Sequence, residues 1–515
     1  MPIEHLNSLA FRAWIDEAEQ HSRFSDYTEY ENYYLGQFDK VTLPKHITDC
    51  LSTDVATKAN ICRAIIDTKV QYICGKPVSI TVEDDQSEEA KQAERFLYTI
   101  YKNNGLVYKN MLKVIRILAK KGDVFLKIDK QEDGGLLKKY AKKIIEKIAF
   151  WKDYTANYAN QIKINVINPN FVLPKYSDSN YEEMELCAVK YFIYNDKGEK
   201  EWKAEIWYPD LKQYWTLHTL EQSDKTTVAT EKIWDHIWEL DKEEENKYGF
   251  VPFIHIINTI DDREFGISDL HDIVEIQNNY NKVLTDLAIG MDYQAFQRIF
   301  IIGAMTKAGK QWDISPGTVT EIPNPDAKVE FIPNADMSPY LESLKMIKAL
   351  ACEVSQTPQI ALGTIEGGIP SGYALRIHYQ PLENKSNETK VLLQEAFQAL
   401  NEMIFIMASI DGKANYAGMA TKLQFMGGLP IDEASIVETH TKQLANGTIS
   451  RETAMQEEGV EDIDEEKERI RSESMETDLY GSQAERISEE SASIEEMMKG
   501  LNLTKAPEEV PITEE

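Results

Sequence analysis

The sequence has few cysteines and no paired-cysteine motif. Five cysteines are dispersed among 515 residues, at positions 50, 62, 74, 187 and 352. A scattered, odd-numbered set gives neither a disulfide framework nor a CxxC metal site, and it is typical of a protein that folds in a reducing compartment. The nine histidines are equally dispersed, without HxxxH or HExxH spacing, so we expect no zinc site.

Long apolar runs are also missing. No run reaches the roughly 18 residues that a membrane-spanning helix needs. The stretch Met403–Ile410 lies between acidic residues and predicts a buried helix segment instead. The first 20 residues carry acidic side chains and no unbroken apolar stretch, so we expect no signal peptide and no membrane contact.

Positive charge is scarce. The 56 Lys and Arg stand against 86 Asp and Glu, which gives a formal net charge of −30. A protein that grips DNA through its phosphates needs a basic surface, so this composition argues against tight DNA binding. From Glu452 onward, 21 acidic side chains oppose 6 basic ones. We expect residues 491–515 to form an acidic, disordered tail.

Nucleotide-binding motifs are absent from the sequence. No GxxxxGK[ST] occurs, and no GxGxxG follows a predicted strand. The glycine-rich stretch Gly363–Arg376, GTIEGGIPSGYALR, fits neither pattern and has no lysine to reach a phosphate. We therefore interpret it as a flexible loop between two helices, with Ser371 as the cap of the second helix.

An acidic cluster at 261–272 has two interpretations. Its carboxylates could hold Mg²⁺ for nuclease chemistry. However, Ser268 and Asp269 favour the N-terminus of a helix, where acidic side chains meet the helix dipole. Gly266 gives the chain freedom to turn into that helix. Capping is the preferred interpretation, with metal binding as the alternative.

A second acidic cluster, Asp462–Glu473, resembles a calcium-binding loop at four positions. Its sixth position is Lys467, where the sharp turn of such a loop requires glycine. We therefore prefer a charged helix with i,i+4 pairing. We expect no metal, no cofactor and no enzymatic activity.

The patterns that are present predict an α+β fold. Amphipathic helices alternate with short strands up to about residue 105, and a β meander is expected between residues 122 and 258, interrupted by a basic helical insertion at 136–154. Two helices with more than one apolar face follow, at 268–297 and 338–356, separated by an insert with two short strands. A long helix then contains Pro381, which predicts a kink.

The order of the motifs resembles the portal proteins of tailed bacteriophages, of the siphophage type. The matching stretches are YENYYLG, IIDTKVQYICGKPVSI, KGDVFLKID, GFVPFIHIINTIDDREFGISDL, IQNNYNKVLTDL, VSQTPQIALG, PSGYALR, LPIDEASIVE and LANGTISRETA. They occur in the expected order between about residues 27 and 470. The basic insertion and the acidic end depart from the pattern.

The resemblance implies a portal fold with wing, stem, clip and crown. The expected divisions are an N-terminal wing at 1–267, stem helices at 268–297 and 338–356 around a clip at 298–337, a tunnel loop at 357–371, a kinked long helix with wing strands at 372–430, crown helices at 431–490 and the tail at 491–515. The tunnel loop would project into a DNA channel through Gly363, Thr364, Ile365, Glu366, Gly367, Gly368, Ile369, Pro370 and Ser371. The residues expected to pack the stem are Leu270, Ile273, Val274, Tyr280, Leu284, Leu287, Leu341, Leu344 and Ile347.

The resemblance also implies partners and a location. The protein would form a homo-oligomeric ring of about twelve subunits at one vertex of the virion capsid, assembled in the host cytoplasm. Double-stranded DNA would pass through it without sequence specificity. The terminase large subunit, head-tail connector proteins, the major capsid protein and scaffolding proteins would contact it. A terminase-like or nuclease enzyme, or another capsid or tail component, is the alternative.

Overall fold

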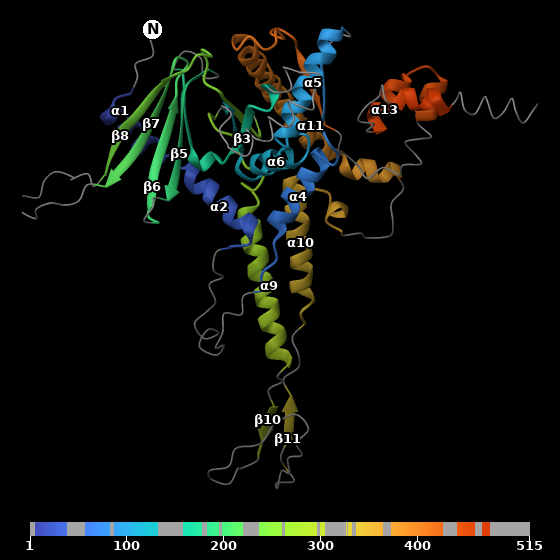
Figure 1. Cartoon of the computed structure of the whole chain (residues 1–515). Helices are drawn as coiled ribbons and strands as arrows, with labels where there is room; N and C mark the ends of the chain where they lie inside the picture. The colour runs from blue at the N-terminus through green and yellow to red at the C-terminus, as the bar shows by residue number, and fades with distance from the viewer. Residues whose placement is uncertain are drawn as a thin grey trace, which may run out of the picture. The chain divides into compact units, whose positions relative to one another are not determined.

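The structure is a computed structural model, and it divides the chain into two units, Met1–Pro430 and Ile431–Glu515. It describes residues 6–38, 57–82, 87–131, 158–177, 183–194, 198–219, 236–259, 263–295, 299–303, 326, 328–331, 336–363, 372–425, 440–458 and 466–473. Helices and strands are mixed along the chain (Figure 1). The predicted α+β class is confirmed.

A three-stranded antiparallel sheet lies inside the first unit. Its strands run in the order β3 (Ile162–Ile167), β2 (Asp123–Lys130) and β9 (Phe253–Ile257). The first six residues of β2 are buried in succession. Because successive side chains of a strand point to opposite faces, both faces of this strand must be covered.

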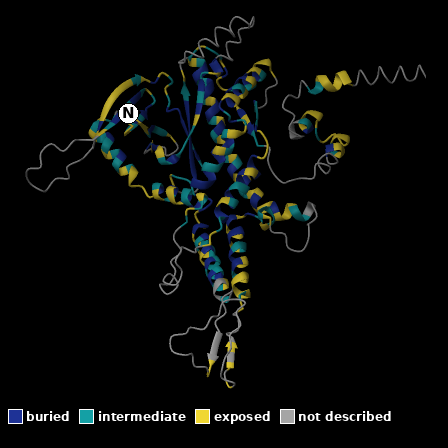
Figure 2. Cartoon of the chain, turned by 60° about the horizontal axis from the view of Figure 1, so that its bottom comes forward, coloured by how far each residue is buried: buried dark blue, intermediate teal, exposed yellow. Residues whose placement is uncertain are grey.

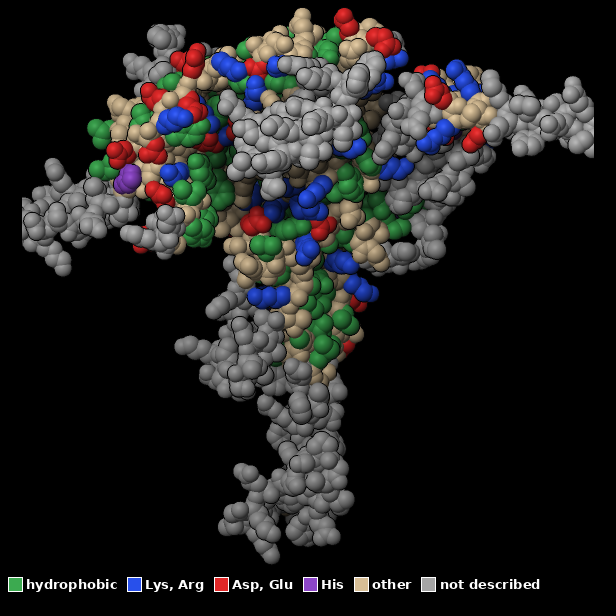
Figure 3. Space-filling view, in the orientation of Figure 1, with side chains coloured by type: hydrophobic (Ala, Val, Ile, Leu, Met, Phe, Trp, Pro, Cys, Tyr) green, Lys and Arg blue, Asp and Glu red, His purple; other side chains and the backbone are tan. Residues whose placement is uncertain are grey.

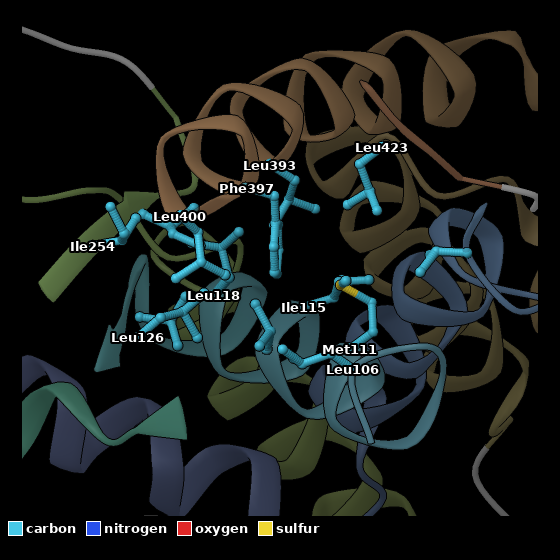
Figure 4. Close-up of a cluster of buried hydrophobic side chains, with 14 of the residues drawn as sticks. Leu106, Met111, Ile115, Leu118, Leu126, Ile254, Leu393, Phe397, Leu400 and Leu423 are labelled. Atoms are coloured by element: carbon cyan, nitrogen blue, oxygen red, sulfur yellow. The ribbon is translucent and has the colours of Figure 1, made fainter. Parts of the chain in front are cut away.

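Helices α6 (Lys109–Lys121) and α11 (Gly372–Ile410) pack on this sheet. Together with α4 (Ile61–Ile73) and α5 (Glu88–Asn103) they form the main core. Figure 4 shows the side chains of Ile115, Leu126 and Phe397 meeting in this core. The caps agree with the sequence: the Ser87 side chain accepts a hydrogen bond from the Ala90 N–H at the start of α5.

Helix α11 is long and apolar enough, by composition alone, to cross a membrane. Its apolar residues nevertheless have a place in the core. Leu393, Phe397, Leu400 and Ile404 recur at helical spacing, and each is fully buried. The helix packs against α4, β9 and β12 (Thr421–Gln424), so its composition is that of a core helix.

A five-stranded antiparallel sheet lies beside this core. Its strands run in the order β4 (Val172–Tyr176), β5 (Met184–Tyr194), β6 (Lys200–Trp207), β7 (Leu211–Thr219) and β8 (His236–Glu245). Helix α1 (Ser8–Glu19) packs on one face through Phe11 and Ile15, which contact Trp215 and Trp238. The meander was predicted, but β8 was not, because its acidic end, DKEEE, has little β propensity.

Several further short elements lie in the first unit. They are α2 (Arg23–Leu35), β1 (Ser79–Val82), which pairs with β12, and the single turns η1 (Pro169–Phe171) and η2 (Gln359–Leu362). The tyrosines that share a face of α2 are buried as their spacing predicts, and the helix ends at Gly36 with a positive φ.

The predicted basic insertion at 136–154 lies outside the described residues. Its two flanking ends meet in the structure, since Lys130 pairs with Ile162 across β2 and β3. Asp411, just after α11, accepts hydrogen bonds from the Lys130 ammonium at 2.6 Å and from the Tyr158 hydroxyl at 2.9 Å. Burial alone would raise the pKa of Asp411, but these donors and Lys247 lower it to about 2.

The second unit contains short helices, as predicted. A helical stretch at 440–445 precedes α13 (Arg451–Glu458). Gly447 turns the chain between them with a positive φ. The Ser450 side chain accepts a hydrogen bond from the Thr453 N–H at 3.0 Å and so caps the start of α13.

Candidate functional site

Two helices form the region that the sequence predicts as the stem. Helices α9 (Val274–Ala295) and α10 (Ser338–Ser355) contact each other along their lengths (Figure 1). Between them in sequence lie β10 (Ile299–Ile302) and β11 (Lys328–Phe331), which pair antiparallel. The two short strands of the predicted clip are thus present, while residues 304–325 lie outside the described part.

Helix α9 begins later than the predicted start at Ser268. Residues 269–273 form turns, in which the Leu270 carbonyl accepts bonds from the N–H groups of Ile273 and Val274. The Ser268 hydroxyl donates to the Lys120 carbonyl at 2.6 Å and accepts from the Leu270 N–H. The helix is delayed because this segment is tied to the end of α6.

The predicted stem-packing residues fall into three groups. Leu270, Ile273 and Val274 are buried in the main core rather than between α9 and α10. Buried or half-buried along the two helices are Tyr280, Leu284, Leu287, Leu344 and Ile347. Leu341 has 51% of its surface exposed, so it contributes little packing within this chain.

Helix α10 has an exposed apolar stripe beside its buried face. Met346, Leu350 and Val354 recur every four residues and are 72%, 46% and 40% exposed. That spacing places them on one face of the helix. Figure 2 shows exposed residues along the stem helices, and in Figure 3 hydrophobic side chains gather over the same region. The stripe is a surface that nothing in the described part of the chain covers.

Polar side chains of α9 hold the N-terminus of α4. The Gln277 side-chain oxygen accepts hydrogen bonds from the Ile61 and Cys62 N–H groups, at 2.8 and 3.3 Å. Asn281 accepts from the Ala59 N–H at 3.0 Å. The first N–H groups of a helix have no partner within it. The stem is therefore joined to the core by bonds that α4 cannot make internally.

A buried ion cluster lies where α4, α9, α10 and α11 meet. Asp269 contacts the Lys69 ammonium at 2.8 Å and the Lys385 ammonium at 3.0 Å. The side chains of Asp269 and Lys69 are each 3% exposed. Lys385 also donates to the Ser355 carbonyl at 3.2 Å, at the last residue of α10. Lys385 of α11 thus bonds both to the segment that precedes α9 and to the end of α10.

The charges of this cluster stabilise one another. Burial by itself would raise the pKa of Asp269, but the Lys69 and Lys385 ammonium groups outweigh it and lower the pKa to about 2. Burial lowers the pKa of Lys69, an effect that the Asp269 carboxylate opposes. The interpretation of Asp269 as a helix cap is wrong, because the helix starts further on and two ammonium groups bind the carboxylate.

Two glycines allow the chain to cross itself beside the cluster. A Cβ on Gly122 would lie 2.4 Å from the Gly266 carbonyl oxygen, and a Cβ on Gly266 would lie 2.2 Å from the Gly122 oxygen. Gly122 also has a φ of +88°. Gly266 is therefore needed because the two backbone segments lie so close together. The positive φ that only glycine adopts easily occurs at Gly122, not at Gly266 as predicted. The buried Asp123 carboxylate accepts from the Gly266 N–H at 2.8 Å and fixes this crossing.

The predicted tunnel loop, 357–371, is described only up to Gly363, and this first part contains the turn η2. Gly363 closes η2 with a φ of +79°. Its other predicted residues, Thr364–Ser371, including the Ser371 cap, lie outside the described residues. Helix α11 then continues without interruption through Pro381, and the kink at that residue stays a prediction. Tyr379 stacks on Tyr72 of α4 two residues before the proline.

The described residues contain no group of three His, Cys, Asp or Glu side chains that could hold a metal ion. The sequence reasoning missed Lys69 and Lys385. A lysine within an apolar helix face, such as Lys69 between Ile66 and Val70, was the available signal, since a buried lysine needs a carboxylate partner.

The family model of phage portal proteins, SPP1 Gp6-like, matches residues 15–479. The chain belongs to this portal protein family. Comparison with curated proteins gives no match. The family match covers nearly the whole chain and confirms the resemblance seen in the sequence motifs. Portal proteins are structural components of the phage particle, so this chain has a structural role in a virion.

Proposed function

We propose that this portal protein forms a homo-oligomeric ring of about twelve subunits at one vertex of the capsid. Double-stranded DNA passes along the ring axis during packaging and ejection. The terminase large subunit and the head-tail connector proteins dock on the ring, which also contacts capsid and scaffolding proteins. The apolar stripe on α10 is the observation that supports ring formation.

A closed ring requires each subunit to present two different surfaces that fit each other. Helix α10 uses one face to pack on α9 and leaves Met346, Leu350 and Val354 exposed on another. Burying a side chain of this kind contributes roughly 1.5–3 kcal/mol. Apolar stripes at helical spacing that remain in water commonly mark protein interfaces. In a ring, the neighbouring subunit would cover this stripe.

Disrupting this stripe is expected to prevent the ring without unfolding the subunit. In the variant Met346→Glu/Leu350→Glu, two carboxylates would have to be buried at the interface, which is strongly unfavourable. Native mass spectrometry should show a ring for the parent protein and monomers for the variant, with unchanged circular dichroism. Leu9→Glu is the control, because Leu9 is 80% exposed on α1, away from the stem. Rings of the double variant would contradict the interface.

The charges on the stem helices are compatible with sliding DNA. By sequence, the acidic residues of α9 and α10 are Glu275, Asp286, Asp292, Glu342 and Glu353, and the basic ones are Lys282, Lys345 and Lys348. A wall without a basic excess forms few phosphate contacts and would not hold DNA by releasing its counterions. Most of the acidic excess of the chain lies outside these two helices.

The loop between α10 and α11 is proposed to contact the DNA. Deleting Ile365–Ile369 is expected to leave rings intact and to block DNA packaging or retention, because a glycine-rich loop with Glu366 as its one charge can contact a polyanion without binding it tightly. Particle DNA content, measured after nuclease treatment, checks this. Normal packaging and retention by the deletion variant would contradict the proposed role of the loop in DNA passage. It would not affect the ring proposal.

A further inference from the structure

Strand β8 is an outer strand of the five-stranded sheet. In the described part of the chain it pairs only with β7. The Ser8 hydroxyl of α1 donates a hydrogen bond to the Trp238 carbonyl, so this carbonyl is not open to another strand. Residues 239–243 are all exposed. The unpaired backbone groups of an outer strand can pair with another extended chain.

An apolar groove runs beside this strand. It has a volume of about 510 Å³ and is lined by Leu6, Trp215, Ile237, Trp238 and Leu240, together with polar residues. Ile237 and Leu240 are 41% and 38% exposed. Trp215, which also lines the groove, is 2% exposed. The groove therefore offers apolar surface to a partner.

The strand is strongly acidic. From Glu239 to Glu245 it carries five carboxylates and one lysine. Three of the carboxylates are engaged within the sheet: Asp241 accepts from Thr216, Glu243 from Gln213 and Glu244 from Tyr214. Charges at an edge also discourage pairing between identical edges, because like charges repel. A second copy of this strand is therefore excluded, whereas a basic segment is attracted.

We propose that β8 binds an extended, basic segment of a partner protein by strand addition. The partner backbone pairs with residues 239–245. One of its apolar side chains enters the groove against Trp215, and its Lys or Arg side chains face Glu239 and Glu245. This mode combines backbone hydrogen bonds for affinity with alternating side chains for specificity. The surface is distinct from the stem stripe and does not depend on ring formation.

The probe is an acetylated nine-residue peptide of alternating lysine and valine, titrated into the full chain by calorimetry. We expect saturable binding that weakens with added salt, as for exposed charge pairs. The variant Glu239→Lys/Glu245→Lys should weaken it at least tenfold. Glu183→Lys, an exposed carboxylate beside the sheet's other outer strand, β4, is the matched control and should bind as the parent does.

Two further measurements separate strand addition from simple charge attraction. The same peptide N-methylated at every residue cannot donate backbone hydrogen bonds and should bind at least tenfold more weakly. Equal affinity of the methylated peptide, or of a glutamate–valine peptide, would overturn the proposal. A variant lacking residues 1–5 should bind the peptide as the parent does. An affinity gain above tenfold would identify the chain's own N-terminus as the occupant and would also overturn it.

Discussion

Replacing Gly122 with alanine is expected to lower the free energy of unfolding of this protein by about 4 kcal/mol. Two penalties act together at this position. A side chain at a φ of +88° is strained, and its Cβ would lie 2.4 Å from a backbone oxygen that cannot rotate away. Because the Asp123 carboxylate and Asn258 fix the two crossing segments, the backbone has little room to separate.

Substitutions at two other glycines measure the two penalties separately. Gly266→Ala introduces only the steric clash, since its Cβ would lie 2.2 Å from the Gly122 oxygen and Gly266 has no positive φ. Gly249→Ala has the strained φ alone, +76° with no atom within 4 Å, and should cost about 1 kcal/mol. Urea denaturation followed by tryptophan fluorescence measures all three. Equal losses for Gly122→Ala and Gly249→Ala would show that the crossing is not tight.

Removing the charge of Asp269 is expected to have a similarly large effect. Asp269→Asn should lower the free energy of unfolding by about 3–5 kcal/mol, because the buried Lys69 ammonium loses its carboxylate and Lys385 loses one of its two partners. The double variant Lys69→Met/Asp269→Leu should recover much of that loss, since it leaves no unpaired charge on Lys69. Asp272→Asn, at a side chain that is 76% exposed, is the control and should change little.

The same carboxylate gives a pH dependence of defined sign. Its pKa is about 2 in the folded protein against an ordinary value of 3.8, so the unfolded chain binds a proton more readily. The stabilisation is therefore complete above about pH 5 and is lost as the pH falls toward 2, by about 2 kcal/mol in total. Comparing parent and Asp269→Asn between pH 6 and 2.5 checks this. A difference between them that stays constant over the range would contradict the lowered pKa.

Local patterns in the sequence predicted the local structure well. The helical spacing of α2 and the strands of the meander follow rules that act over a few residues. The order of motifs was sufficient to recognise the family. The apolar faces of α9 and α10 were also visible, although the start of α9 moved because Ser268 bonds to α6, far away in the sequence.

The buried ion cluster and the crossing of the two glycines could not be predicted from the sequence, since both depend on contacts between distant residues. Nothing local shows that Lys69 and Lys385 share Asp269, or that Gly122 and Gly266 touch. Short side chains before a helix have the same sequence pattern whether they cap it or bind a distant ammonium group. Only the three-dimensional arrangement distinguishes these roles. Strand β8 was missed for a related reason, because its pairing with β7 outweighs its low intrinsic propensity.

The pairing of Lys130 with Ile162, together with the hydrogen bonds from Lys130 and Tyr158 to Asp411, has a consequence for variation within the family. The chain leaves and re-enters the core at adjacent positions, so the fold sets no length for the 26 residues numbered 132–157. Doubling such a connection costs only about 0.6 kcal/mol of closure entropy. A longer, shorter or different segment can therefore stand here while the chain keeps its core, so new binding properties can evolve in it with little loss of stability.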